Sequence, residues 1–319
     1  MKPALSVIFF TVSSGAGLGL AIWLVLAQWG WAVAGGAPAA NHPLLQWSGG
    51  LSLVLVLAGL MSSTQHLANP RNAWRSLARV RTSWLSREAL CALLWLAFAL
   101  LHGVLSQRGA TLIGFTGALL LLLSLATVIC TAMIYACLRT VPRWRTWHTP
   151  VIYLLHALLA GGLLWSLLRQ ATGVPGGMTN GGLLLSLLAL SLTVTLLYEA
   201  KFSDRVTATI NQALGVPLQA PAGHVQGRVR LLDTGHAHRT FLTNEFGFVL
   251  AREQAWRLRA LMVLLTAVLP VLLLLLAPPI APVLAATVLF FLAGLLVHRW
   301  LFFAQAEHVV RLYHGQAQV

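Results

Sequence analysis

Charged residues are scarce in this chain, and acidic residues are the scarcest of them. Of its 319 residues 9% are charged and only seven are Asp or Glu, whereas 58% are hydrophobic. A soluble domain carries about 25% charged residues, so a surface that faces water on all sides is excluded. The composition fits a protein whose main solvent is a lipid bilayer.

Cysteine is also rare. Cys91, Cys130 and Cys137 all fall inside apolar runs. An iron–sulfur cluster takes about four thiolates, and a disulfide framework takes regularly spaced pairs. We therefore expect no iron–sulfur cluster in this chain, and interpret the cysteines as small core residues. His224 with His236 and His238 could chelate a metal, but no cysteine lies nearby, so we expect no metal site either.

Long apolar runs are what the sequence has in abundance. A helix needs about 20 apolar residues to cross the hydrocarbon core, and the runs do not alternate as the strands of a barrel would. We therefore predict an all-α integral membrane protein, one transmembrane domain over residues 1–319 with eight helices. The predicted spans are Leu5–Ala27, Leu44–Met61, Ala89–Leu105, Leu112–Cys137, Val151–Leu168, Gly181–Ala200, Leu258–Ala277 and Ile280–Phe303.

Basic residues fall almost entirely on one side of these spans. Of the 21 Lys and Arg, 19 lie in the N-terminus, the even-numbered connections and the C-terminal part, and only Arg108 and Arg169 lie opposite. The positive-inside rule then predicts that both termini are cytoplasmic. Because the charges lie in connections between apolar runs, we expect no nucleic-acid partner.

The sixth connection, residues 201–257, is the only sizeable segment outside the spans. We interpret it as a cytoplasmic insertion. It either docks a partner subunit, with Arg228 and Arg230 in the contact, or is a solvated linker.

The second connection concentrates polar chemistry. His66 lies at the end of span two and Glu88 at the start of span three. At a membrane boundary, such a pair can exchange protons with water while it faces an apolar pocket, as a lipid-soluble quinone requires. The alternative is structural: His66 caps a helix end, and Glu88 pairs with Arg87 or satisfies a helix N-terminus.

The arginines between these two residues have several possible partners. They can serve orientation alone, contact anionic lipid headgroups, or dock an acidic face of another subunit. For the docking role we single out Arg75 and Arg81.

The same stretch resembles a signature of the membrane anchor subunits of dimethyl sulfoxide reductase-type molybdoenzymes. That signature reads His-Leu-Gly-x-Pro, then Arg, then Leu-Ser-x-Glu. Ala68 stands where the family usually has glycine. The resemblance extends to the eight-span layout and to Val141-Pro-x-Trp144 with Trp147-x-Thr-Pro150. The matching positions are His66, Leu67, Pro70, Ala73, Leu77, Arg79, Ser83, Leu85, Ser86 and Glu88.

This resemblance implies an anchor without haem or iron–sulfur cluster of its own. It implies a quinone site, for ubiquinone or menaquinone, at His66 and Glu88, with Arg71 and Arg79 as neighbours. It also implies electron transfer to a four-cluster ferredoxin-like iron–sulfur subunit, which serves a molybdopterin catalytic subunit. The expected location is the bacterial inner membrane, with lipid around the spans.

The insertion carries a second resemblance. Gly227–Asp233 and Leu242–Arg252 are similar to anchors of cytoplasmic quinone-linked sulfite dehydrogenases. Sulfite oxidation with quinone reduction is therefore the expected reaction of the complex. The alternatives are a quinol-oxidising anchor of the dimethyl sulfoxide reductase type and, from another class, a secondary transporter.

Histidines within the spans raise the question of haem. Ligation by two histidines needs imidazoles on facing helices at matched depth, whereas His102 and His156 lie at different depths. His298 and Arg299, near the end of the last span, are candidates for the wall of a site or an interface.

Overall fold

Our computed structural model describes residues 3–31, 42–65, 70–109, 111–174, 181–202, 209–213 and 254–314. Eight helical segments in these ranges are long and apolar enough to cross a membrane, which confirms the predicted number, and the described ranges contain no β-strand. Seven of them are single α-helices: α1 (Leu5–Gln28), α2 (Pro43–Thr64), α3 (Trp84–Gln107), α4 (Ile113–Ala136), α5 (His148–Ala171), α6 (Gly181–Phe202) and α12 (Ala281–Ala304).

The seventh span is composite. It consists of α10 (Ala255–Val263), the π-helical turn η2 (Leu264–Val268) and α11 (Leu269–Leu276). Pro270 follows the π-helical turn; proline has no N–H to donate, so the regular α-helical hydrogen-bond ladder cannot be complete there. Residues 277–280 then link this span to α12, as the adjacent prolines predict.

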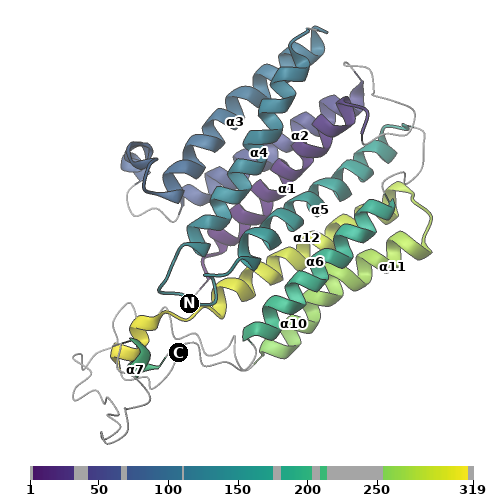
Figure 1. Cartoon of the computed structure of the whole chain (residues 1–319). Helices are drawn as coiled ribbons and strands as arrows, with labels where there is room; N and C mark the ends of the chain where they lie inside the picture. Colours follow the sequence, from purple (N-terminus) through teal and green to yellow (C-terminus); the bar gives the residue numbers. More distant parts are fainter. Residues whose placement is uncertain are drawn as a thin grey trace, which may run out of the picture.

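The helices form one bundle with α1 at its centre (Figure 1). α1 packs most extensively against α2 and α5, and also against α4 and α12. The chain begins and ends at the same end of the bundle (Figure 1). We call this the terminal end, and the opposite end, where α1 and α3 finish, the far end.

Small residues allow α1 to lie this close to its neighbours. Ser13 donates to the Leu55 carbonyl and Ser52 to the Gly17 carbonyl, each at 2.7 Å, which ties α1 to α2. On the other side, a Cβ on Gly19 or Gly161 would collide with the backbone of α5 or α1, respectively. Such close backbone approach is typical of small residues between membrane helices.

Shorter elements lie at the terminal end. They are the 3-10 helices η1 (Pro70–Arg79) and η3 (Val309–His314) and the short α7 (Ile210–Ala213). Most of the predicted insertion, residues 203–208 and 214–253, lies outside the described residues. α3 begins at Trp84, five residues before the predicted span, because Ser83 caps it by accepting from the Ser86 N–H at 3.4 Å.

The connection between α4 and α5 is fastened to the rest of the terminal end. The Trp144 indole donates to the Phe302 carbonyl of α12 at 2.9 Å. Arg143 and Arg259 both lie 2.7 Å from the Glu199 carboxylate, which joins this connection to α6 and α10. Trp144, which ends the Val141-Pro-x-Trp144 motif, is therefore a packing residue.

Candidate functional site

Four helices bring polar side chains to the same depth at the terminal end. Glu88 lies four residues inside α3, and Thr131, Tyr153 and Arg299 each lie five residues inside α4, α5 and α12. At about 1.5 Å per residue, this places all four about 6–8 Å from the helix ends. We call them the Glu88 cluster.

Glu88 is buried, with 5% of its surface exposed. Its carboxylate accepts a short hydrogen bond from the Thr131 hydroxyl, which lies about as deep in the neighbouring helix. Among the described residues it has no ion-pair partner, since Arg87 donates instead to the carbonyls of Val80 and Arg81 and lies over the Trp84 ring. Among the described residues, the carboxyl group is thus bonded to one neutral hydroxyl.

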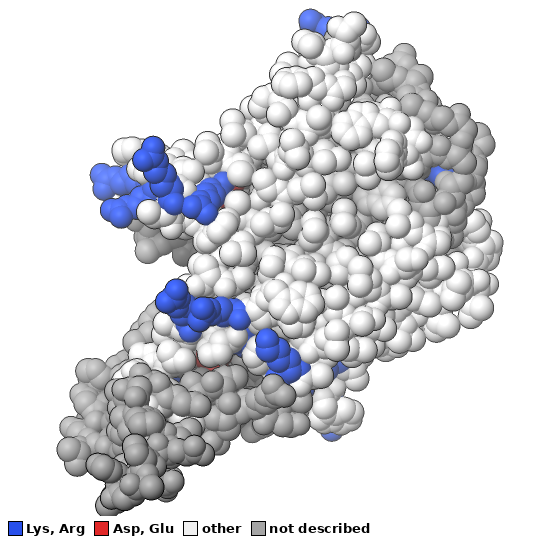
Figure 2. Space-filling model, in the orientation of Figure 1, with Lys and Arg blue, Asp and Glu red and all other residues white. Residues whose placement is uncertain are grey.

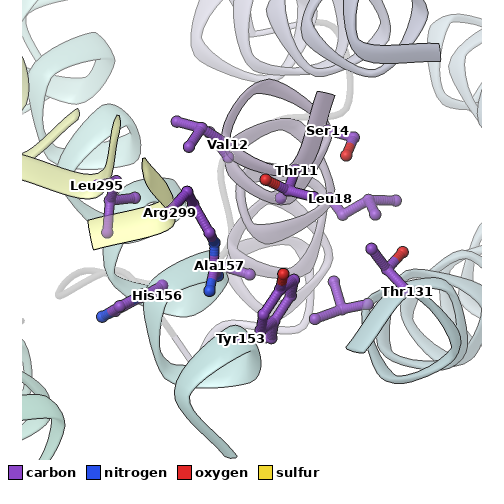
Figure 3. Close-up of a pocket in the computed structure, with 13 residues that line it drawn as sticks. Thr11, Val12, Ser14, Leu18, Thr131, Tyr153, His156, Ala157, Leu295 and Arg299 are labelled. Atoms are coloured by element: carbon purple, nitrogen blue, oxygen red, sulfur yellow. The ribbon is translucent and has the colours of Figure 1, made fainter. Parts of the chain in front are cut away.

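Thr131 also lines a narrow cavity between α1, α4, α5 and α12 (Figure 3). Tyr153 and Arg299 line the same cavity, and the Arg299 guanidinium lies 3.4 Å from the centre of the Tyr153 ring. The free space measures about 10 Å³, which is roughly the room that one water molecule needs. The Thr131 hydroxyl, which bonds to Glu88, and the buried Arg299 guanidinium therefore lie on the same cavity.

Two histidines extend the cluster toward the middle of the bundle. The rings of His156 and His298 meet edge to face, with their centres 4.7 Å apart. This contact leaves no room for a haem between them. His102 lies toward the far end of α3, bonded to Gln28 and Thr116, so it does not pair with His156.

Several polar atoms of this region have no hydrogen-bond partner among the described residues. They are Tyr153 Oη, His156 Nδ1, His298 Nδ1 and Arg299 Nη1. A buried polar atom without a partner costs about 1–3 kcal/mol, and a charged one costs more. Tyr153 and Arg299 can donate to the carbonyl or hydroxyl oxygens of a quinone ring, and each histidine nitrogen can donate or accept according to its tautomer. The chemistry of the residues present therefore fits that ligand.

The predicted site residues are only partly described. His66, Arg228 and Arg230 lie outside the described residues, as does the side chain of Arg71. Arg79 is exposed in η1 and does not line the cavity. Four residues were predicted to bind the quinone, and the structure describes the side chains of two of them. Glu88 lies in the buried cluster and Arg79 lies on the surface.

The two described docking candidates, Arg75 and Arg81, are also exposed. Figure 2 shows Lys and Arg gathered over η1 and over the connection between α4 and α5, with an uncharged surface along the helices. Exposed Arg139 and Arg145 belong to the second group. Of the described acidic residues, Glu88 is buried and Glu199 and Glu307 are paired with arginines, so none of these three carboxylates compensates the exposed arginines of this surface.

Sequence reasoning found some members of the cluster and missed others. Arg299 and His298 were expected to form a wall or an interface, and His156 was considered only for haem. Tyr153 and Thr131 were not expected at all. Their shared depth in the predicted spans is the one signal in the sequence that could have found them.

The fold and this cluster define a multi-pass helical membrane protein with a buried ionisable site near one end of its spans. The chain belongs to the DMSO reductase anchor subunit (DmsC) family, whose model matches residues 1–305. It is thus a membrane anchor subunit, as the sequence signature predicted. Among the described residues, no group of three His, Cys, Asp or Glu side chains could hold a metal ion.

Two curated relatives agree with this assignment. A sulfite dehydrogenase subunit of Allochromatium vinosum is 34% identical over 98% of this chain and 99% of its own length. Anaerobic dimethyl sulfoxide reductase chain YnfH of Escherichia coli K12 is 24% identical over 50% of this chain and 57% of its own length. The anchor family's match over residues 1–305 includes all of the spanning helices from α1 to α12.

Proposed function

We propose that this anchor binds a quinone at the terminal end and passes electrons between it and an iron–sulfur subunit, which serves a molybdopterin catalytic subunit. Bound quinone supplies a carrier of two electrons and two protons. The observation that carries the proposal is the Glu88 cluster, a buried carboxyl joined through Thr131 to a cavity with orphaned donors.

Each residue has a distinct role in this proposal. Glu88 exchanges protons with the quinone, together with His66 from the second connection. Arg71 and Arg79 are proposed as neighbours outside the cavity, since Arg79 is exposed in η1 and does not line it. Arg299 and Tyr153 donate hydrogen bonds to a ring oxygen. Because the cavity has room for only about one water, a quinone ring can enter only when the side chains that line the cavity move apart.

Sulfite oxidation is the reaction that we propose for the complex. The relative named for sulfite dehydrogenase aligns over nearly the whole chain, whereas the one named for dimethyl sulfoxide reductase aligns over half of it. The test is to purify the tagged chain from its native membranes. Molybdenum, iron and sulfite-dependent quinone reduction should accompany it, and quinol-dependent reduction of dimethyl sulfoxide without sulfite oxidation would contradict it.

The terminal end is proposed to face the cytoplasm of a bacterial inner membrane, with residues 201–257 as a cytoplasmic insertion in a single transmembrane domain. A green fluorescent protein fused after Val319 should then fluoresce. Alkaline phosphatase inserted at Gly109 should be active, because its disulfides form only outside the cytoplasm. An active phosphatase at the C-terminus and an inactive one at Gly109 would reverse the orientation.

The basic surface is proposed to dock the iron–sulfur subunit, with Arg75, Arg81, Arg228 and Arg230 in the contact. Replacing both Arg75 and Arg81 by Glu should weaken retention of that subunit about tenfold, because like charges then oppose an acidic partner face. Co-purification at increasing salt measures this. Arg108→Glu, an exposed change at the far end, is the control and should change nothing; equal retention in all variants would place docking elsewhere.

A further inference from the structure

A second and larger cavity lies at the far end, between α1, α2, α3 and α4. Its volume is about 310 Å³, which falls at the lower limit of ligand sites of about 300–1,000 Å³. α2 and α3 contact each other much less than they contact α1 and α4, respectively. Exposed Gly50 on α2 and exposed Gly103 and Val104 on α3 line the cavity, so it opens sideways to the lipid between these two helices.

One pole of this cavity is polar but carries no charge. His102 is 3% exposed, and its ring nitrogens lie 2.8 Å from the Gln28 carboxamide and 2.9 Å from the Thr116 hydroxyl. Ser106 and Gln107 line the same pole. No Lys, Arg, Asp or Glu lines the cavity among the residues that the structure describes.

Apart from Gln46 and Ser52 of α2, the rest of the lining is apolar, and most of it lies deeper in the bundle. His102 is five residues from the end of α3, which puts the polar pole about 8 Å below the far boundary. Trp95, Ala99 and Leu53 line the space toward the centre of the bundle. The cavity is thus shaped for an amphiphile with an uncharged, hydrogen-bonding head and an apolar body.

We propose that this far-end cavity binds the ring of a second isoprenoid quinone, with a ring oxygen at the amide group of Gln28, whose carbonyl oxygen is held by His102. A phospholipid headgroup would bring a buried phosphate that no described lining cation could pair with. The inference rests on the proposed function for the choice of a quinone. The site differs from the Glu88 cluster in holding no carboxyl group among its described lining residues, and 14 residues of α3, about 21 Å, separate Glu88 from His102.

The experiment uses a photoreactive azidoquinone on the whole complex in native membranes, with the labelled peptides identified by mass spectrometry. Label should appear in residues 43–53 and 95–107. Gly103→Leu and, on the other helix, Gly50→Leu should each lower this labelling at least about tenfold, a loss of about 1.4 kcal/mol or more in binding. A Cβ at either glycine meets nothing within 4 Å, so the larger side chain fills the cavity without a backbone clash.

Gly182→Leu on α6 is the matched control, because a Cβ there also meets nothing within 4 Å and Gly182 does not line the cavity. Label confined to peptides around Glu88, equal label in all three glycine variants, or a lipid acyl chain in the cavity would overturn the inference. Labelling at the far end with full quinone-linked turnover in a Glu88→Gln variant would instead overturn the Glu88 site alone.

Discussion

Replacing Glu88 by Gln is expected to lower quinone-linked turnover at least about a hundredfold, because a positioned group that transfers protons contributes about 10²–10⁴ to a rate. Glutamine is nearly isosteric and can still bond to Thr131, so the helices should assemble normally. Activity of the catalytic subunit with an artificial dye, which bypasses the quinone, should stay unchanged. Steady-state kinetics with a short-chain quinone and with the dye measure the two activities separately.

Two further variants test whether the effect belongs to this carboxyl group. Glu307→Gln removes another carboxylate at the terminal end, one that pairs with Arg311 instead of bonding to Thr131, and should leave both activities intact. His66→Gln should resemble Glu88→Gln, because His66 is the proposed partner in proton exchange. Unchanged quinone kinetics in both the His66 and the Glu88 variants would remove those roles.

Arg299→Gln is expected to raise the apparent KM for quinone about 10- to 100-fold, since a hydrogen bond from a charged donor contributes about 1.5–3 kcal/mol. Arg299 is 3% exposed, has no ion-pair partner among the described residues, and leaves one guanidinium nitrogen unbonded. A buried charge without a counter-charge costs several kcal/mol. Its removal should therefore leave the melting temperature of the complex unchanged or higher.

The melting temperature separates the binding role from a purely structural one. If Arg299 serves only to stack on Tyr153, Arg299→Gln and Tyr153→Leu should both lower the melting temperature and leave quinone kinetics alone. Arg299→Lys, which keeps the charge but loses the planar stacking group, should give an intermediate KM if the proposal is right. Quinone kinetics equal to those of the unaltered complex in all Arg299 variants would contradict it.

The sequence was sufficient for the number of spans and their approximate bounds. A bilayer requires about 20 continuous apolar residues per helix, and this requirement can be read from hydropathy without any tertiary contact. The predicted ends of the helices were less accurate. α3 starts at Trp84 and not at Ala89, because its first turn is polar and is capped by Ser83, so hydropathy does not reveal it. The motif around Glu88 also led correctly to the anchor family.

The neighbours of Glu88 could be found only in the tertiary structure. A spanning helix is apolar on the side that faces lipid and on the side that faces its neighbours, so the sequence does not reveal which side points inward. Thr131, Tyr153 and Arg299 lie far apart in the chain, and the central place of α1 brings them together around one cavity. Sequence alone therefore determined an eight-helix membrane anchor with an acid near one boundary, and only the helix packing decided which side chains surround that acid.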